Sequence, residues 1–132
     1  SGRNPIIIDL ALAAKAKGVK IISLTNVQYS RSVTSRHSSG KRLFEVSDIV
    51  IDNHGDIGDA CCELTGIVQK AGPSSTVIGA AILNTIIVEV CEQLIANGIN
   101  ISYILFGEFR WGDLRNAELY EEYKEVIHYE FM

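Results

Sequence analysis

Apolar residues in the first part of the chain alternate between helical and strand-like patterns. Over residues 5–17 they recur at intervals of three and four, which predicts a helix. Asn4 is a good N-cap for this helix, and Pro5 suits its first position because that N–H needs no partner. The short apolar runs at 20–25 and 49–53 predict two buried strands of a parallel sheet.

The pattern continues with longer elements. Residues 64–69 are a candidate third strand, 77–96 predict a long buried helix, 101–106 a further strand and 114–128 an acidic final helix. Residues 26–42 are polar and are predicted to form a long loop. Strands that alternate with helices indicate an α/β fold with a parallel sheet. Ligands of such sheets bind at the carboxyl ends of the strands.

Composition and charge exclude several function classes. The 132 residues, 47% of them apolar, correspond to one domain with a real core. A net charge of −4 argues against nucleic-acid binding by this segment. The most apolar stretch, 77–88, is shorter than the roughly 20 residues that cross a bilayer, so no membrane partner is expected. Cys61, Cys62 and Cys91 lack zinc-ligand spacing, which favours reduced thiols, a cytoplasmic protein, and neither metal nor cofactor.

Small polar residues stand directly before two of the predicted helices. They are Ser1, Gly2 and Asn4 in the first loop and Ser74, Ser75 and Thr76 in the second. Free backbone N–H groups and the positive end of the helix dipole make such loops suitable for phosphate. Each loop is equally consistent with an ordinary capped helix start. If both bind ligand, we expect them to converge on one pocket, because both follow strands of one parallel sheet.

The loop over residues 31–42 has four basic residues and no acidic one. It is suited to an anionic substrate, although such segments are usually solvated surface loops. Its candidate ligands are Ser38, Ser39 and Lys41, and His37 is a candidate catalytic base. Glu89 is the second candidate base, or the point at which the long helix reaches solvent. The Asp and His residues at 52–59 could bind a metal or act in acid–base chemistry, but they lack a recognised ligand spacing. A role in the turn is therefore the better interpretation.

These motifs, in this order, resemble the SIS (sugar isomerase) domain family. They are Ser-Gly-x-Asn-Pro at 1–5, Ser-Arg-His-Ser-Ser-Gly-Lys at 35–41, Asp-Ile-Val-Ile-Asp-Asn at 48–53 and Gly-Pro-Ser-Ser-Thr at 72–76. The likeness covers most of residues 1–106. It is to an uncharacterised bacterial sugar isomerase-like branch, and the chain looks like the C-terminal part of such a protein.

The resemblance implies a three-layer α/β/α, Rossmann-like fold whose N-terminal strand and helix are missing here. Residues 1–132 would form a partial phosphosugar-binding domain, with 108–132 as an acidic helical segment. The ligand would be a phosphorylated sugar, and the protein a homo-oligomer. An aldose–ketose phosphosugar isomerase is one expectation, with His37 or Glu89 as base. A non-catalytic sugar-phosphate-sensing or oligomerisation domain is the alternative. Without the missing strand, we expect the isolated chain to oligomerise or to be marginally stable.

Overall fold

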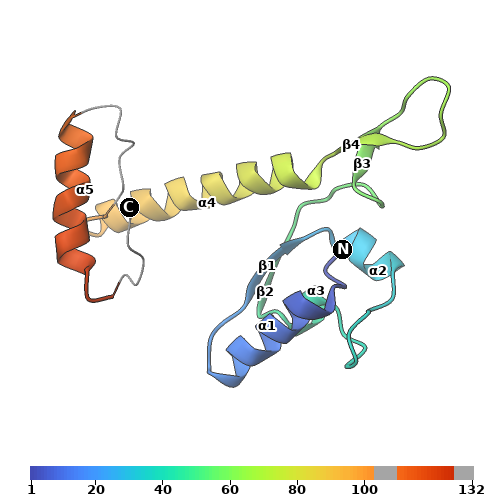
Figure 1. Cartoon of the computed structure of the whole chain (residues 1–132), viewed down its shortest axis with the longest axis horizontal. Helices are drawn as coiled ribbons and strands as arrows, with labels where there is room; N and C mark the ends of the chain where they lie inside the picture. The colour runs from blue at the N-terminus through green and yellow to red at the C-terminus, as the bar shows by residue number, and fades with distance from the viewer. Residues whose placement is uncertain (103–109, 127–132) are drawn as a thin grey trace. The chain divides into compact units, whose positions relative to one another are not determined.

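The computed structural model of the protein describes residues 1–102 and 110–126 (Figure 1). It consists of helices and small sheets, in agreement with the predicted α/β class. The chain divides into two compact units, Ser1–Ile86 and Ile87–Met132. The candidate site lies in the first unit.

The first unit opens with a helix and two strands at the predicted places. Helix α1, Pro5–Ala16, begins at Asn4, whose side-chain oxygen accepts a hydrogen bond from the backbone N–H of Ile6 at 3.1 Å. Strands β1, Ile22–Thr25, and β2, Ile49–Asp52, pair in parallel. The prediction that both strands are buried is wrong for β2, whose residues are exposed or half-buried. The paired positions Ile22 and Ile49 are both more than half exposed, so this face of the sheet is open in the structure.

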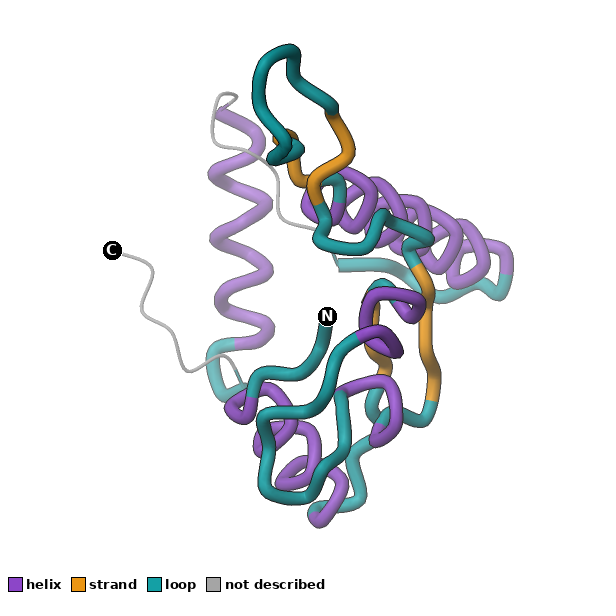
Figure 2. The backbone as a smooth tube through the Cα atoms, turned by 90° about the vertical axis from the view of Figure 1, so that its right-hand side faces the viewer, coloured by secondary structure: helices purple, strands orange, loops and turns teal. Residues whose placement is uncertain are grey.

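Two short helices follow β1. Helix α2, Val27–Ser32, lies inside the segment that was predicted as loop, and helix α3, Leu43–Val46, follows that segment. The loop prediction is therefore wrong at its start, because Asn26 caps α2 by accepting a hydrogen bond from the N–H of Tyr29 at 2.8 Å. Figure 2 shows the three helices gathered beside β1 and β2. Their buried apolar residues are Ile8 and Ala11 of α1 and Val46 of α3.

A second, separate sheet follows β2. Strands β3, Ala60–Cys62, and β4, Ala71–Pro73, pair antiparallel, and each of the two sheets has two strands. The strand predicted at 64–69 is wrong, since these residues form the exposed tip of this hairpin. Gly66 lies at the tip with a φ of 89°, a conformation that a strand does not contain.

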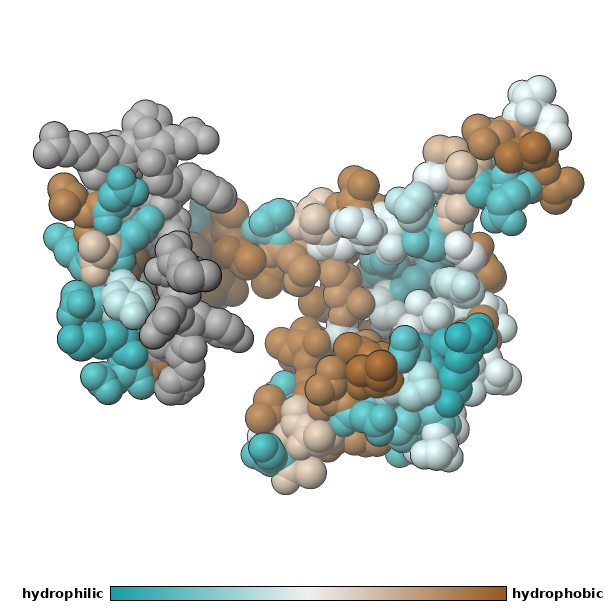
Figure 3. All heavy atoms as spheres, in the orientation of Figure 1, coloured by the Kyte–Doolittle hydropathy of each residue, from teal (hydrophilic) through white to brown (hydrophobic). Residues whose placement is uncertain are grey.

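Helix α4, Ser75–Ala96, begins two residues before its predicted start. The prediction that it is buried is wrong for this structure, in which Val77 is 72% and Ile87 59% exposed and the buried residue of α4 is Gly79. Figure 3 shows apolar surface along α4. With 22 residues and a mean hydropathy of 1.6, it is the one described helix with the length and composition of a membrane span. Core helices of soluble proteins meet the same criterion.

The second unit contains helix α5, Arg110–Tyr123, which starts four residues before and ends five residues before the predicted helix. Leu119 is its buried apolar residue, and the hydroxyl groups of Ser102 and Tyr123 lie 3.0 Å apart. Most of the strand predicted at 101–106 lies outside the described residues, as do positions 127–128.

Candidate functional site

A cavity of about 750 Å³ lies at the carboxyl ends of β1 and β2. Its lining comes from the loop before α1, the end of β1, the loop after α2 and the region from Asn53 to the start of α4, together with Ile7 of α1, Tyr29 of α2 and Leu43 of α3. The volume falls within the roughly 300–1,000 Å³ that is usual for small-molecule sites. The position is the one expected for a ligand site in a parallel sheet.

The loop before α1 is held by its carbonyl groups. The carbonyl oxygen of Gly2 accepts a hydrogen bond from the N–H of Leu43 at 2.7 Å, and that of Arg3 accepts one from the N–H of Arg36 at 3.2 Å. The N–H groups of Gly2 and Arg3 donate to no residue that the structure describes. Because the carbonyls are satisfied and these N–H groups are not, the loop offers donors to an anion.

Buried hydroxyl groups at the end of β1 and in α2 hold the same loop in place. The Ser30 hydroxyl, fully buried, donates to the carbonyl oxygen of Ser1 at 2.6 Å and lies 3.3 Å from the Thr25 hydroxyl. Thr25 closes β1 and lines the cavity. The short helix α2 therefore fixes the loop before α1 against the end of the strand.

Two buried asparagines join the loop after β2 to the end of β1. The Asn26 side-chain amide donates to the carbonyl oxygens of Gly55 and Asp56, the second at 3.2 Å. The backbone N–H of Asn53 donates to the Thr25 carbonyl at 3.1 Å, and its side-chain oxygen accepts from the N–H of Gly55 at 3.2 Å. These bonds place the following residues, up to Asp59, at the cavity.

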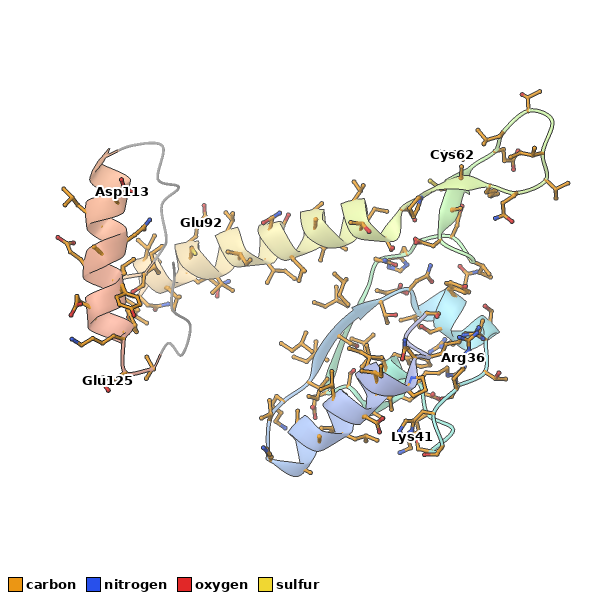
Figure 4. All side chains as sticks on the ribbon, in the orientation of Figure 1. Arg36, Lys41, Cys62, Glu92, Asp113 and Glu125 are labelled. Carbon is orange, nitrogen blue, oxygen red and sulfur yellow. The ribbon has the colours of Figure 1, made fainter. Side chains whose placement is uncertain are left out.

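The charged residues on the lining are Arg3, Arg36 and Asp59. Neither guanidinium group forms an ion pair with a carboxylate in the described part of the chain. Arg36 lies on the loop after α2, where Figure 4 labels it together with Lys41. Two arginines without a carboxylate partner, beside free backbone N–H groups, form a positively charged part of the cavity lining.

Asp59 holds the start of α4. Its carboxylate accepts hydrogen bonds from the backbone N–H of Ser75 at 2.8 Å and from the Ser75 hydroxyl at 2.9 Å. These bonds lower the pKa of Asp59 below its ordinary value. Its carbonyl oxygen also accepts from the N–H and the hydroxyl of Ser74, at 3.0 and 3.1 Å. The backbone N–H and the hydroxyl of Ser75, the first residue of α4, are therefore already bound to a carboxylate.

The structure brings some of the predicted ligands together and not others. Ser1, Gly2, Asn4 and Ser75 all line the cavity, so residues of both loops lie on one pocket. The lining does not include Ser38, Ser39, Lys41, Ser74 or Thr76. Asp59 is interpreted from the sequence as a turn residue and not as part of the site, because its partner Ser75 lies 16 residues later, too far for a local capping signal.

The proposed base His37 does not line the cavity. The imidazole of His37 has its Nε2 atom 2.8 Å from Asp9 and its Nδ1 atom 2.7 Å from the Ser39 hydroxyl, so the ring joins its loop to α1. The Glu89 carboxylate accepts a hydrogen bond from the Gln93 side chain at 2.9 Å and belongs to the second unit. Over residues 1–102 and 110–126, no three His, Cys, Asp or Glu side chains are placed to hold a metal ion.

Arg42 ties the loop after α2 into the fold, a role that sequence reasoning did not assign to it. Its guanidinium donates to the carbonyl oxygens of Ser30 and Val33 at 3.0 and 3.2 Å, and to the Glu45 carboxylate at 2.8 Å. The hydrogen bonds from the Arg42 side chain and backbone lower the pKa of Glu45 to about 2. The pair therefore buttresses the loop that carries Arg36.

This pair predicts a pH dependence of stability. Glu45 has a lower pKa in the folded state than in the unfolded chain, so its contribution is complete above about pH 4.5 and is lost as pH falls towards 2. We expect Glu45→Gln to cost about 0.5–1 kcal/mol at pH 6, because solvent partly screens the pair. The cost should shrink towards pH 2.5 in urea melts. Glu63→Gln, which changes the charge equally, is the control, and equal pH profiles for both variants would contradict the assignment.

Comparison with known proteins finds relatives that carry the name UPF0309 protein. No family model matches it. It is 50% identical over 129 residues to a UPF0309 protein of Shouchella clausii, covering 98% of this chain and 52% of that protein. UPF0309 proteins of Oceanobacillus iheyensis and Geobacillus thermodenitrificans are each 46% identical, with 52% and 51% of their lengths covered. The chain therefore spans about half the length of the curated relatives it matches.

Proposed function

We propose that the first unit binds a phosphorylated sugar in the cavity at the ends of β1 and β2. The observation that carries this proposal is the positively charged part of the cavity lining. It combines the N–H groups of Gly2 and Arg3, the N-terminal end of α1 and the guanidinium groups of Arg3 and Arg36, which pair with no carboxylate of residues 1–102 and 110–126. Backbone donors, a helix dipole and guanidinium groups are the features that bind phosphate in proteins.

The remainder of the cavity suits a polar, hydroxyl-bearing group. Asn4, Asn53 and Ser75 contribute amide and hydroxyl groups, and Ile7 and Leu24 contribute apolar surface. Sugars combine such hydroxyl edges with apolar C–H faces. The resemblance of the loop motifs to SIS domains supports the same class of ligand.

The contacts of His37 favour sugar-phosphate binding without catalysis. An aldose–ketose isomerase needs a base within hydrogen-bond reach of the sugar carbons. His37 is bonded to Asp9 and Ser39 instead of facing the cavity. We therefore propose a sugar-phosphate-sensing role for this segment ahead of isomerisation.

Removal of Arg36 tests the phosphate site. We expect Arg36→Ala to weaken binding of inorganic phosphate and glucose 6-phosphate by about tenfold, or about 1.4 kcal/mol, through loss of a charge-assisted hydrogen bond. Lys17→Ala removes the same charge at the opposite end of α1 and should have little effect. Isothermal titration calorimetry at one fixed ionic strength measures both. Equal losses of phosphate affinity in the two variants would show that Arg36 acts only through non-specific electrostatic attraction of the anion.

A further inference from the structure

We propose that the cavity binds its ligand in one fixed direction, with the phosphate at the loop before α1 and sugar hydroxyls on the Asp59 carboxylate. This inference rests on the proposed function and makes it more specific. It assigns Asp59 as the residue that selects a hydroxyl-bearing phosphate monoester. It also assigns the start of α4 to the sugar end of the site instead of the phosphate end.

The first argument is that the start of α4 already holds an anion. Both the backbone N–H and the hydroxyl of Ser75 donate to the Asp59 carboxylate. A phosphate dianion at the same place would have to displace this carboxylate and lie next to its charge. Like charges a few ångströms apart repel strongly in a partly enclosed site. The backbone and hydroxyl donors of Ser75 at this helix start are therefore occupied by the protein itself.

The second argument is that the lining carries charges of both signs on different segments. Arg3 and Arg36 are joined by a backbone hydrogen bond at 3.2 Å, so both basic residues come from neighbouring segments of the chain. Asp59, the acidic residue of the lining, comes from the segment before α4. A ligand with both a phosphate and hydroxyl groups matches this lining.

The third argument is that Asp59 is fixed and retains acceptor capacity. Its backbone has a φ of 74°, and two hydrogen bonds from Ser74 hold its carbonyl oxygen. Each carboxylate oxygen accepts one hydrogen bond from Ser75, whereas a carboxylate has about four acceptor positions. The hydrogen bonds from Ser75 lower the pKa of Asp59, so at neutral pH it accepts hydrogen bonds from hydroxyl groups and is a poor proton acceptor.

The test compares three probes in Asp59→Asn: inorganic phosphate, butyl phosphate and glucose 6-phosphate. Asparagine tolerates the left-handed backbone and keeps an oxygen for Ser75, so the change removes mainly the charge. In the parent chain we expect glucose 6-phosphate to bind about tenfold more tightly than butyl phosphate. In Asp59→Asn we expect most of this preference to be lost, with the affinity for inorganic phosphate unchanged or slightly higher.

Asp56→Asn is the matched control, because Asp56 is an exposed carboxylate that pairs with Lys70 at 3.6 Å and does not line the cavity. It should keep the preference for glucose 6-phosphate. A thermal melt of each variant reports whether the fold is retained. Ser75→Ala provides a second test, since it leaves the Asp59 charge in place. We expect it to retain phosphate binding, because the phosphate is assigned to the loop before α1 and not to the hydroxyl of Ser75.

The possible outcomes separate the two proposals. A severalfold gain in phosphate affinity in Asp59→Asn, together with a loss in Ser75→Ala, would overturn the assigned direction and place the phosphate at α4. A preference for glucose 6-phosphate that persists in Asp59→Asn would overturn the role of Asp59 alone. If the parent chain binds none of the three probes, the proposed function itself fails.

Discussion

Gly2→Ala is expected to weaken phosphate binding strongly and to destabilise the first unit. Gly2 has a φ of 59°, in the left-handed region that costs an L-residue about 1–2 kcal/mol. A Cβ atom at this position would lie 2.9 Å from the Cβ atom of Leu43 and 3.6 Å from the Thr25 hydroxyl oxygen. Leu43 also donates its N–H to the Gly2 carbonyl at 2.7 Å. The loop therefore has to move away from α3, and the N–H groups proposed to bind phosphate move with it.

Gly18→Ala is a control that measures the effect of backbone strain in the absence of a close contact such as that between Gly2 and Leu43. Gly18 has a φ of 78°, but no atom lies within 4 Å of the position that its Cβ would occupy. We expect Gly18→Ala to cost about 1–2 kcal/mol of stability and to leave phosphate affinity unchanged. We expect Gly2→Ala to cost about 2–4 kcal/mol, because overpacking adds to strain, and to weaken phosphate binding by more than about tenfold.

Denaturant melts and calorimetric titrations of the two variants measure both quantities. The comparison is informative because the same atoms are added to a left-handed glycine in each case. Similar affinities in Gly2→Ala and in the parent would show that the loop before α1 does not bind the phosphate. Similar stabilities of the two variants would show that the contact with Leu43 relaxes at little cost.

The start of the fold was predictable because its signals are local. Asn4 and Pro5 mark the start of α1 within two residues of each other, and the apolar runs of β1 and β2 are continuous. The location of the cavity followed from these elements, since the ends of the parallel strands carry polar residues. Interactions between residues close in sequence were therefore sufficient to predict the first elements and the position of the cavity.

The remaining features depend on contacts between residues distant in sequence. Gly2 is constrained by Leu43, and Ser75 is bound by Asp59, so neither role is visible in the motif that contains the residue. Burial of α4 was inferred from its composition alone, whereas burial is a property of what packs against a helix. The hairpin between β3 and β4 places its apolar residues 64–69 at an exposed tip, which the apolar run alone could not indicate.

Ile8→Ala is expected to have the largest effect on stability of the changes outside the cavity. Ile8 is fully buried in α1, and the other buried apolar residues of the first unit are Ala11 and Val46, both smaller. Truncation of a buried isoleucine to alanine usually costs about 2–5 kcal/mol, because apolar contacts are lost and a cavity remains. In a unit with so few buried apolar side chains, this loss is a large part of the roughly 5–15 kcal/mol of a typical domain.

Ile6→Ala is the matched control, since it makes the same change in the same helix at a side chain that is 70% exposed. Alanine is the better helix former, so we expect Ile6→Ala to change stability by less than about 0.5 kcal/mol. Urea melts of the two variants give the difference directly. A difference of about 2 kcal/mol or more would establish that α1 packs through Ile8. Equal losses would mean that Ile6 is also buried in solution, and that the open apolar face beside β1 is covered there.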